Sequence, residues 1–496
     1  MANRRKTLFG IDLRSLAAFR IGIGALLLTD LGMRATDLTA HYTDDGIVPR
    51  SLLDDRLRDS WRWSWHMLNG SAAFQSALFL VAAFAAAALM VGFRTRFATV
   101  VSWLLLVSLH ARNPFIVNAG DVLLRVVLFW SIFLPLGAVW SIDHRYRPQA
   151  IPKNPTTSVA SAAILLQVAC MYWMTAYFKW HGIWLTPDGF RRVVELDSYA
   201  KPFAYQLLNF PDLLPWMGCG VLSLEICGPI LAFSPFATKP IRLLVFVCFC
   251  LLHIGIELSL TVGLFSIISI LAWILFIPDV FWNRCNAKWP QHLPPTTTPT
   301  TTPTTTDRQR WIASTVNGFV LLIAIYVPIW NFATVRGSWL NRYQQTLSPF
   351  VELTGLRQKW NMFVAPPSSD GWYVAVARLK DGQTVDLLRD GAPADWKSFE
   401  KPVYAYRRFP NHRWRKFYRQ LSQRHSDSTF PYICRFLGGR WNATHPESQW
   451  AKSVELHFME PVESEAGEVP DSFMQQVLHE ELFEPPASSF EQDSTP

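Results

Sequence analysis

Apolar residues are concentrated in the first 282 residues of the chain, where they recur in runs long enough to cross a bilayer. A transmembrane helix needs about 20 mainly apolar residues, and on that criterion the pattern predicts about nine spans. We place them at residues 13–33, 72–92, 98–110, 122–139, 158–178, 214–233, 243–258, 260–282 and 311–329. Residues 243–282 make up roughly two crossings, so the chain must fold back near residues 257–263.

The chain after residue 282 is mostly polar, apart from the last predicted span. Residues 293–308 read LPPTTTPTTTPTTTDR, a low-complexity stretch without material for a packed core. Later, GWYVAVARLKDGQTVDLL alternates apolar and polar positions around Asp381-Gly382, a hairpin signal, and SVELHFME predicts another strand. We therefore predict five segments: a membrane domain at 1–284, a linker at 285–310, a last transmembrane helix at 311–333, a β-rich domain at 334–479 and an acidic disordered tail at 480–496.

The predicted fold class is an all-α polytopic membrane bundle followed by a β-rich α+β domain. Composition agrees, since half of the 496 residues are hydrophobic and only 17% are charged, where soluble proteins average about 25%. Five of the seven cysteines fall inside apolar runs, so a disulfide framework is excluded and no metal site is expected.

Basic residues in short loops predict the orientation. With the N-terminus in the cytoplasm, the inner loops carry more Lys and Arg per residue than the outer ones. The β-rich domain is then extracytoplasmic, at the cell (inner) membrane. This placement removes nucleic acid as a partner, although the formal charge is +8, and leaves membrane lipids and a peptide or protein substrate as candidates.

A basic segment lies within the predicted extracytoplasmic domain, between Tyr406 and Leu421. Its apolar residues recur at helical spacing and its Lys and Arg residues form the rest of the surface. The favoured interpretation is an ordinary amphipathic helix with a solvated basic face. The alternative is contact with anionic headgroups or with an acidic partner.

Lys179 lies near the end of the apolar run MYWMTAYFKW. A charged side chain inside a membrane span costs free energy, so its presence there requires an explanation. Tyr172 and Thr175 lie seven and four residues before it, on the same helical face. Lys179 can extend to the headgroups, or it can be a desolvated amine that acts as a base near neutral pH.

Three other places carry polar groups in or next to spans. His253 and Glu257 are four residues apart and share a helical face, either as an interhelical hydrogen-bonding pair or as the lining of a polar cavity. Asn118 and Asp121 belong to a polar turn, where capping of the next helix is the favoured role of Asp121.

Arg20 and Asp30 lie in the first predicted span. They are ten residues apart, too far to pair along one helix, so each requires a partner elsewhere, and we interpret both as structural. Phosphate-binding loops, dinucleotide fingerprints, HExxH and GxSxG motifs are absent from the sequence.

Several segments between residues 12 and 282 resemble, in order and spacing, the membrane domain of vitamin K-dependent gamma-glutamyl carboxylase and its bacterial relatives, the horizontally transferred transmembrane (HTTM) family. They are DLRSLAAFRIGIGALLLTD, HYTDDGIVPRSLL, NAGDVLLRVVLF, MYWMTAYFKWHGIW and HIGIELSLTVGLF. Lys179 falls on the catalytic lysine of the carboxylases and His253 on a histidine implicated in the active site. Gly120 departs from the pattern, since the animal enzymes have an active-site histidine there. The loop at residues 34–69 also lacks the cysteine that ties loop to ectodomain in those enzymes.

The resemblance implies a reaction in which neutral Lys179 deprotonates a vitamin K- or menaquinone-type hydroquinone. Its oxidation by O2 to an epoxide generates a base strong enough to remove a carbon proton from glutamate, and CO2 traps the carbanion. On this analogy Lys179 and His253 are catalytic, and the quinol is bound by Tyr172, Thr175, Glu257 and Asn118. Because of Gly120, epoxidation without carboxylation is a variant of this hypothesis. A non-catalytic scaffold or lipid-binding protein is the alternative.

Overall fold

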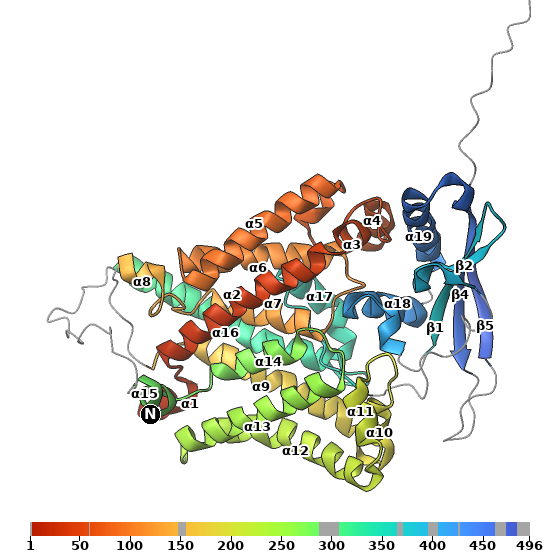
Figure 1. Cartoon of the computed structure of the whole chain (residues 1–496). Coiled ribbons are helices and arrows are strands. Elements are labelled where there is room, and N and C mark those ends of the chain that lie inside the picture. The colour runs from red at the N-terminus through yellow and green to blue at the C-terminus, as the bar shows by residue number, and fades with distance from the viewer. Residues whose placement is uncertain are drawn as a thin grey trace, which may run out of the picture.

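The computed structural model separates a helical bundle from a smaller unit built around an antiparallel sheet (Figure 1). It describes residues 2–58, 60–146, 155–286, 307–364, 371–394, 405–424, 427–461 and 473–483. Residues 287–306, most of the predicted linker, lie outside the described residues. The N-terminus lies at the end of the bundle remote from the sheet (Figure 1), the arrangement that a cytoplasmic N-terminus and an extracytoplasmic sheet would require.

Within the described ranges, the bundle contains ten helices of very different length. They are α2 (Leu13–Ala35), α5 (Ala72–Val91), α6 (Thr95–Arg112), α7 (Ala119–Ser131), α9 (Val159–Trp180), α12 (Leu214–Ala232), α13 (Thr238–Ser259), α14 (Phe265–Ile274), α15 (Asp279–Asn286) and α16 (Asp307–Ala333). Shorter helices flank or connect them: α1 (Ala2–Phe9), α3 (Leu38–Tyr42), α4 (Arg50–Leu57), α8 (Ile142–Tyr146), α10 (Asp188–Val194), α11 (Pro202–Leu207) and α17 (Gln344–Leu353).

Among the described residues, six helices are long and apolar enough to cross a membrane, or seven if α14 and α15 form one bent span. The nine predicted spans are therefore not confirmed. The predicted span at 122–139 is the 13-residue α7, only about 20 Å long; other helices surround it, so it need not match the bilayer. The predicted span at 260–282 is bent by 93° between α14 and α15, where Pro278 lacks the N–H that a continuous helix would use.

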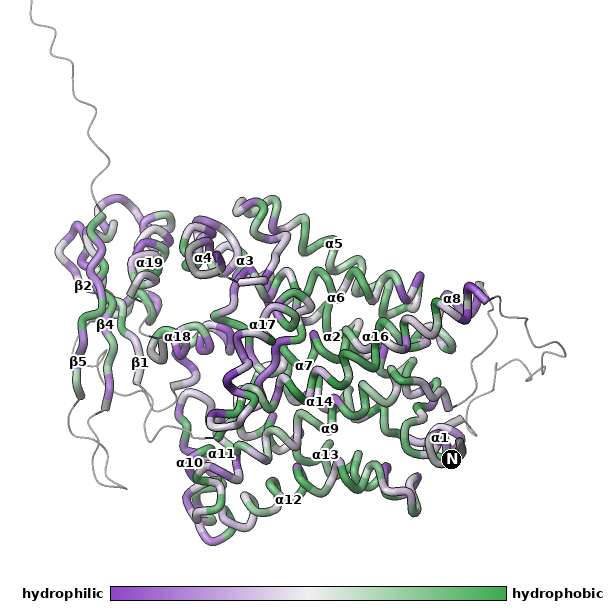
Figure 2. The backbone as a smooth tube through the Cα atoms, turned by 180° about the vertical axis from the view of Figure 1, so that it is seen from behind, coloured by the Kyte–Doolittle hydropathy of each residue, from purple (hydrophilic) through white to green (hydrophobic). Residues whose placement is uncertain are grey.

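The outer helices carry the apolar surface expected of membrane contact. Figure 2 shows hydrophobic positions over the bundle and hydrophilic ones towards the sheet. On α5 and α13, large apolar side chains such as Phe84, Leu80, Leu251 and Leu244 are exposed. Apolar patches of this extent are covered by lipid or protein in stable structures. Together with the candidate spans, this makes the chain a multi-pass membrane protein.

The C-terminal unit contains a five-stranded antiparallel sheet in the order β3-β2-β1-β4-β5. The strands are β1 (Trp372–Leu379), β2 (Thr384–Asp386), β3 (Ala392–Pro393), β4 (Ala451–Pro461) and β5 (Phe473–Leu482). The predicted hairpin at Asp381-Gly382 joins β1 to β2, with Gly382 at a positive φ of 88°. β5 enters the predicted tail and ends at Leu482, because its backbone pairs with β4.

Helices α18 (His412–Arg424) and α19 (Phe430–Thr444) lie between the sheet and the bundle (Figure 1). The predicted apolar face of α18 is confirmed, since Trp414, Phe417 and Leu421 are buried. The predicted solvated basic face is wrong in part. Arg413 and Arg415 are also buried, because acidic and carbonyl partners from the bundle, distant in sequence, meet them there.

Candidate functional site

Lys179 lies in the last turn of α9 and points into the protein. It is only 4% exposed, so the headgroup-reaching interpretation is wrong. Its Nζ lies 2.6 Å from Glu225 Oε1 of α12 and 4.2 Å from the ring centroid of Trp184. A carboxylate and an aromatic face thus hold the amine on two sides, as expected for a cation taken out of water.

Glu225 is the main site residue that the sequence reasoning missed. It is 5% exposed and is the acidic residue of the apolar helix α12. A lone acid within a membrane helix is a signal by itself, because its insertion is costly unless a partner is present. Applied to all spans, this criterion would have identified Glu225 as the candidate partner of Lys179.

A second polar group forms where α9, α13 and α14 meet. The Tyr172 hydroxyl lies 2.6 Å from His253 Nε2 and accepts a hydrogen bond of 3.0 Å from Trp273 Nε1. Which of the two groups donates depends on the tautomer of His253. When the hydroxyl donates to Nε2, Nδ1 carries the ring proton. Nδ1 finds no hydrogen-bond partner among the described residues.

The two groups form one buried centre. Tyr172 and Lys179 lie on α9, seven residues or about two turns apart on the same face, which places the two groups side by side. Phe249 stacks on Trp273 at 4.1 Å between ring centroids and supplies an aromatic wall. Glu225 Oε2, like His253 Nδ1, is buried without a partner in the described part of the chain. The centre therefore contains two unsatisfied polar atoms, a carboxylate oxygen and an imidazole nitrogen, in apolar surroundings, where each is costly unless a ligand satisfies it.

Two of the predicted site residues, Thr175 and Glu257, do not contribute a polar group to the buried centre. Thr175 donates to the Met171 carbonyl one turn back on its own helix, so its hydroxyl is already used. Glu257 does not join His253 but pairs with Lys201 at 2.9 Å, near the end of α13. Four residues advance a helix by about 6 Å, which carries Glu257 out of the centre.

Asn118 and Asp121 form the capping box of α7, in which each side chain accepts from the backbone N–H of the other. The predicted capping role of Asp121 is confirmed. Gly120 between them packs closely against α14, and a Cβ there would lie 3.0 Å from the Phe265 Cα. The structure leaves little room for a larger side chain at position 120.

Asp121 also belongs to a buried Arg–Asp cluster that joins the bundle to the C-terminal unit. Arg34 lies 2.7 Å from both Asp30 and Asp121, and Arg413 of α18 pairs with the same two carboxylates. The expectation that Asp30 has partners elsewhere is thus met, as it is for Arg20, which donates to the Trp140 carbonyl. Two cations balance two anions, so the buried cluster is neutral.

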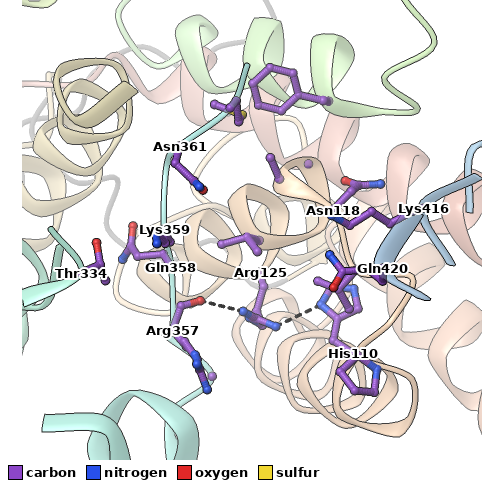
Figure 3. A pocket seen from close by; sticks show the side chains of 18 of the residues that line it. His110, Asn118, Arg125, Thr334, Arg357, Gln358, Lys359, Asn361, Lys416 and Gln420 are labelled. Atoms are coloured by element: carbon purple, nitrogen blue, oxygen red, sulfur yellow. Dashed lines mark hydrogen bonds between the residues drawn. The ribbon is translucent and has the colours of Figure 1, made fainter. Parts of the chain in front are cut away.

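A cavity of about 720 Å³ lies between α6, α7, α18 and the segment after α17 (Figure 3). Asn118 lines it, whereas Lys179 and His253 do not. The cavity adjoins the centre at two points. Phe265 lines it and makes an edge contact with the His253 ring, and Trp184 donates to the carbonyl of the lining residue Phe363.

Two buried histidines outside the spans predict acid sensitivity. Burial, with Arg413 nearby, lowers the pKa of His41 to about 3 and that of His412 to about 4. An unfolded histidine has a pKa near 6.5, so below that pH the unfolded state binds more protons. Each histidine should therefore reduce the free energy of unfolding by up to about 1.4 kcal/mol per pH unit as the pH falls from 6.5 towards 4.

The variant His41→Phe tests this prediction. Neither ring nitrogen of His41 has a hydrogen-bond partner within the described ranges, so phenylalanine loses no polar contact. Thermal unfolding in detergent should show little change at pH 7.5 and a gain over the wild type at pH 5. An equal effect of acid on both proteins would show that His41 does not titrate in this way.

The described residues were also compared with the requirements of a metal site. Within the described ranges, no group of three or more His, Cys, Asp and Glu side chains is arranged to hold a metal ion. All seven cysteines are free thiols.

Comparison with known proteins gives one match. No curated protein and no solved structure matches the chain. The family model of the HTTM domain matches residues 10–282, more than half of the chain and the whole region that holds Lys179, Glu225, Tyr172 and His253. The chain belongs to the HTTM domain family.

Proposed function

We propose that Lys179, Glu225, Tyr172 and His253 form a reaction centre for the oxidation of a reduced naphthoquinone by O2, coupled to carboxylation of glutamate in a peptide. The observation that carries this proposal is the buried Lys179–Glu225 pair beside an imidazole nitrogen without a hydrogen-bond partner in the described part of the chain. In this proposal the sheet-containing unit lies on the extracytoplasmic side of the cell membrane, and the N-terminus lies in the cytoplasm.

The centre suits a quinol because it matches both the ring and its hydroxyl groups. The aromatic wall of Phe249 and Trp273 provides apolar contact. The Nδ1–H of His253 can donate to a quinol oxygen, and Glu225 Oε2 can accept a hydroxyl proton. When bound, the quinol would supply, on reaction with O2, the strong base that carbon deprotonation requires.

The residues of the chain then have distinct tasks. Lys179 Nζ and Glu225 Oε1 lie 2.6 Å apart, so the lysine proton can move to the carboxylate and leave a neutral amine. That amine can then accept the quinol hydroxyl proton, and the resulting lysine cation faces the quinol anion, so the buried centre stays neutral overall. Tyr172 fixes the tautomer of His253. The surrounding apolar residues exclude water, which would quench a strong base.

Removal of the imidazole gives the test for this proposal. His253→Phe should reduce epoxide formation by about 10²-fold and raise the quinol KM, since general acid–base groups contribute about 10²- to 10⁴-fold. His181→Gln is a matched control, because His181 is exposed and lies two residues after Lys179. Mass spectrometry of the quinone product measures both. Equal activity of the two variants would show that His253 has no role in the reaction.

Lipid or scaffold binding is the second candidate, favoured by the exposed apolar helices. It predicts no quinol consumption. The buried positions of Arg413 and Arg415 make them unsuitable for direct headgroup contact, so such binding would have to use other cations.

A further inference from the structure

The cavity beside the centre has an unusually one-sided lining. It contains seven Lys and Arg side chains and one acidic side chain, Glu352, among its described residues. The cations are Arg62, Arg125, Arg357, Lys359, Arg415, Lys416 and Arg419. The excess is therefore six positive charges (seven minus one), and the asparagine and glutamine side chains of the lining add further hydrogen-bond donors.

Part of this charge is already balanced or used. Glu352 pairs with Arg357 at 2.7 Å and with Arg62 at 3.8 Å. Arg125 donates to the Arg357 carbonyl at 2.9 Å and contacts His110 Nδ1 at 3.3 Å (Figure 3). These contacts hold one wall of the cavity rigid but supply no further anion.

Further cations line the cavity on two sides. In Figure 3, Lys416 and Gln420 extend from α18 towards Asn118, while Lys359 and Asn361 come from the segment after α17 on the other side. Lys359 has no hydrogen bond or ion pair within the described ranges, and it is exposed, so the cavity is accessible from outside.

Tyr199 lies in a strongly positive part of the cavity. Its ring lies 3.7 Å from the Arg415 guanidinium and 5.2 Å from that of Arg419. Burial alone would raise the pKa of Tyr199, but the charges of Arg419, Arg415 and Lys416 outweigh burial and lower it. The N-terminal residues of α7, Ala119 and Gly120, also line the cavity, so the positive end of that helix dipole adds to the field.

We propose that this cavity binds a phosphate-bearing ligand. A single carboxylate would balance one of six excess charges, whereas a phosphate monoester or a diphosphate brings two or more and many acceptor oxygens. The volume of about 720 Å³ is that of a small-molecule site. The apolar lining by Phe265, Trp330 and Val122 admits either a lipid headgroup with the start of its chains or a soluble phosphate ester.

The test is binding by the full chain in nanodiscs of phosphatidylcholine, without quinol, so that it is independent of the proposed reaction. Pyrophosphate represents the soluble source, and nanodiscs with phosphatidic acid represent the lipid source. The double variant Lys359→Gln/Lys416→Gln should weaken binding about tenfold or more. Lys452→Gln is the control, because Lys452 is exposed on β4 and lies outside the cavity lining.

Each outcome decides the proposal. Pyrophosphate binding that the double variant weakens assigns a soluble ligand, and phosphatidic acid retention alone assigns a lipid. A second variant, Gln420→Glu, adds a negative charge to the lining without removing a lysine, and should also weaken binding. Binding of a glutamate-rich peptide in place of both phosphates, or binding equal in all variants, would overturn the proposal and leave the reaction centre untouched.

Discussion

Lys179→Met should reduce quinol epoxidation by about 10²- to 10⁴-fold, the range that a positioned acid–base group contributes. The amine is the group in the centre best placed to exchange a proton with Glu225, at 2.6 Å. Methionine keeps the length of the side chain but cannot accept a proton. Epoxide formation by mass spectrometry, with O2 uptake, measures the loss.

The substitution leaves Glu225 buried without its partner, which costs about 3–5 kcal/mol when a charge stays uncompensated. Lys179→Met/Glu225→Gln removes that charge and should restore folding but not activity. Lys179→Arg keeps the ion pair but cannot give up its proton at neutral pH, so it too should fold and stay inactive. Lys201→Met, at a partly exposed ion pair, is the matched control. An active Lys179→Arg variant would show that the site needs a charge and not a base.

Arg413→Ala should destabilise the contact between the bundle and the C-terminal unit by about 3–5 kcal/mol, as for other broken buried pairs. Without Arg413, the Arg–Asp cluster keeps two carboxylates and one guanidinium, so a net negative charge remains buried. Hydrogen exchange of α18 and thermal unfolding in detergent measure the effect.

The matched control is Arg407→Ala, since Arg407 is exposed, and its effect should stay within about 0.5 kcal/mol. Adding Asp121→Asn to Arg413→Ala restores neutrality and should recover part of the loss. If Arg413→Ala behaves like the control, the cluster does not hold the two units together.

Much of the helical framework could be predicted from local pattern. The span expected at 13–33 is α2 at Leu13–Ala35, and the fold-back expected near 257–263 lies between α13 and α14. Such features depend on apolar length and on proline or polar breaks, which are local. The short α7 could not be predicted, because its length is allowed by the helices that surround it.

The site was less predictable because its partners are distant in sequence. Lys179 and Glu225 are 46 residues apart, and Arg413 and Asp121 are 292 apart. Sequence identified Lys179, Tyr172 and His253 as costly polar groups but not their pairing. Glu225 carried the same signal, and the basic face of α18 looked solvated because nothing local shows that carboxylates from α2 and α7 meet it.

The most direct measurement supplies the purified wild-type chain, in nanodiscs, with a reduced naphthoquinone and ¹⁸O2. The account predicts an epoxide that carries the heavy isotope, formed well above the rate of heat-inactivated protein and absent with Lys179→Arg. Quinone without epoxide, produced at the same rate by native and inactivated protein, would contradict it.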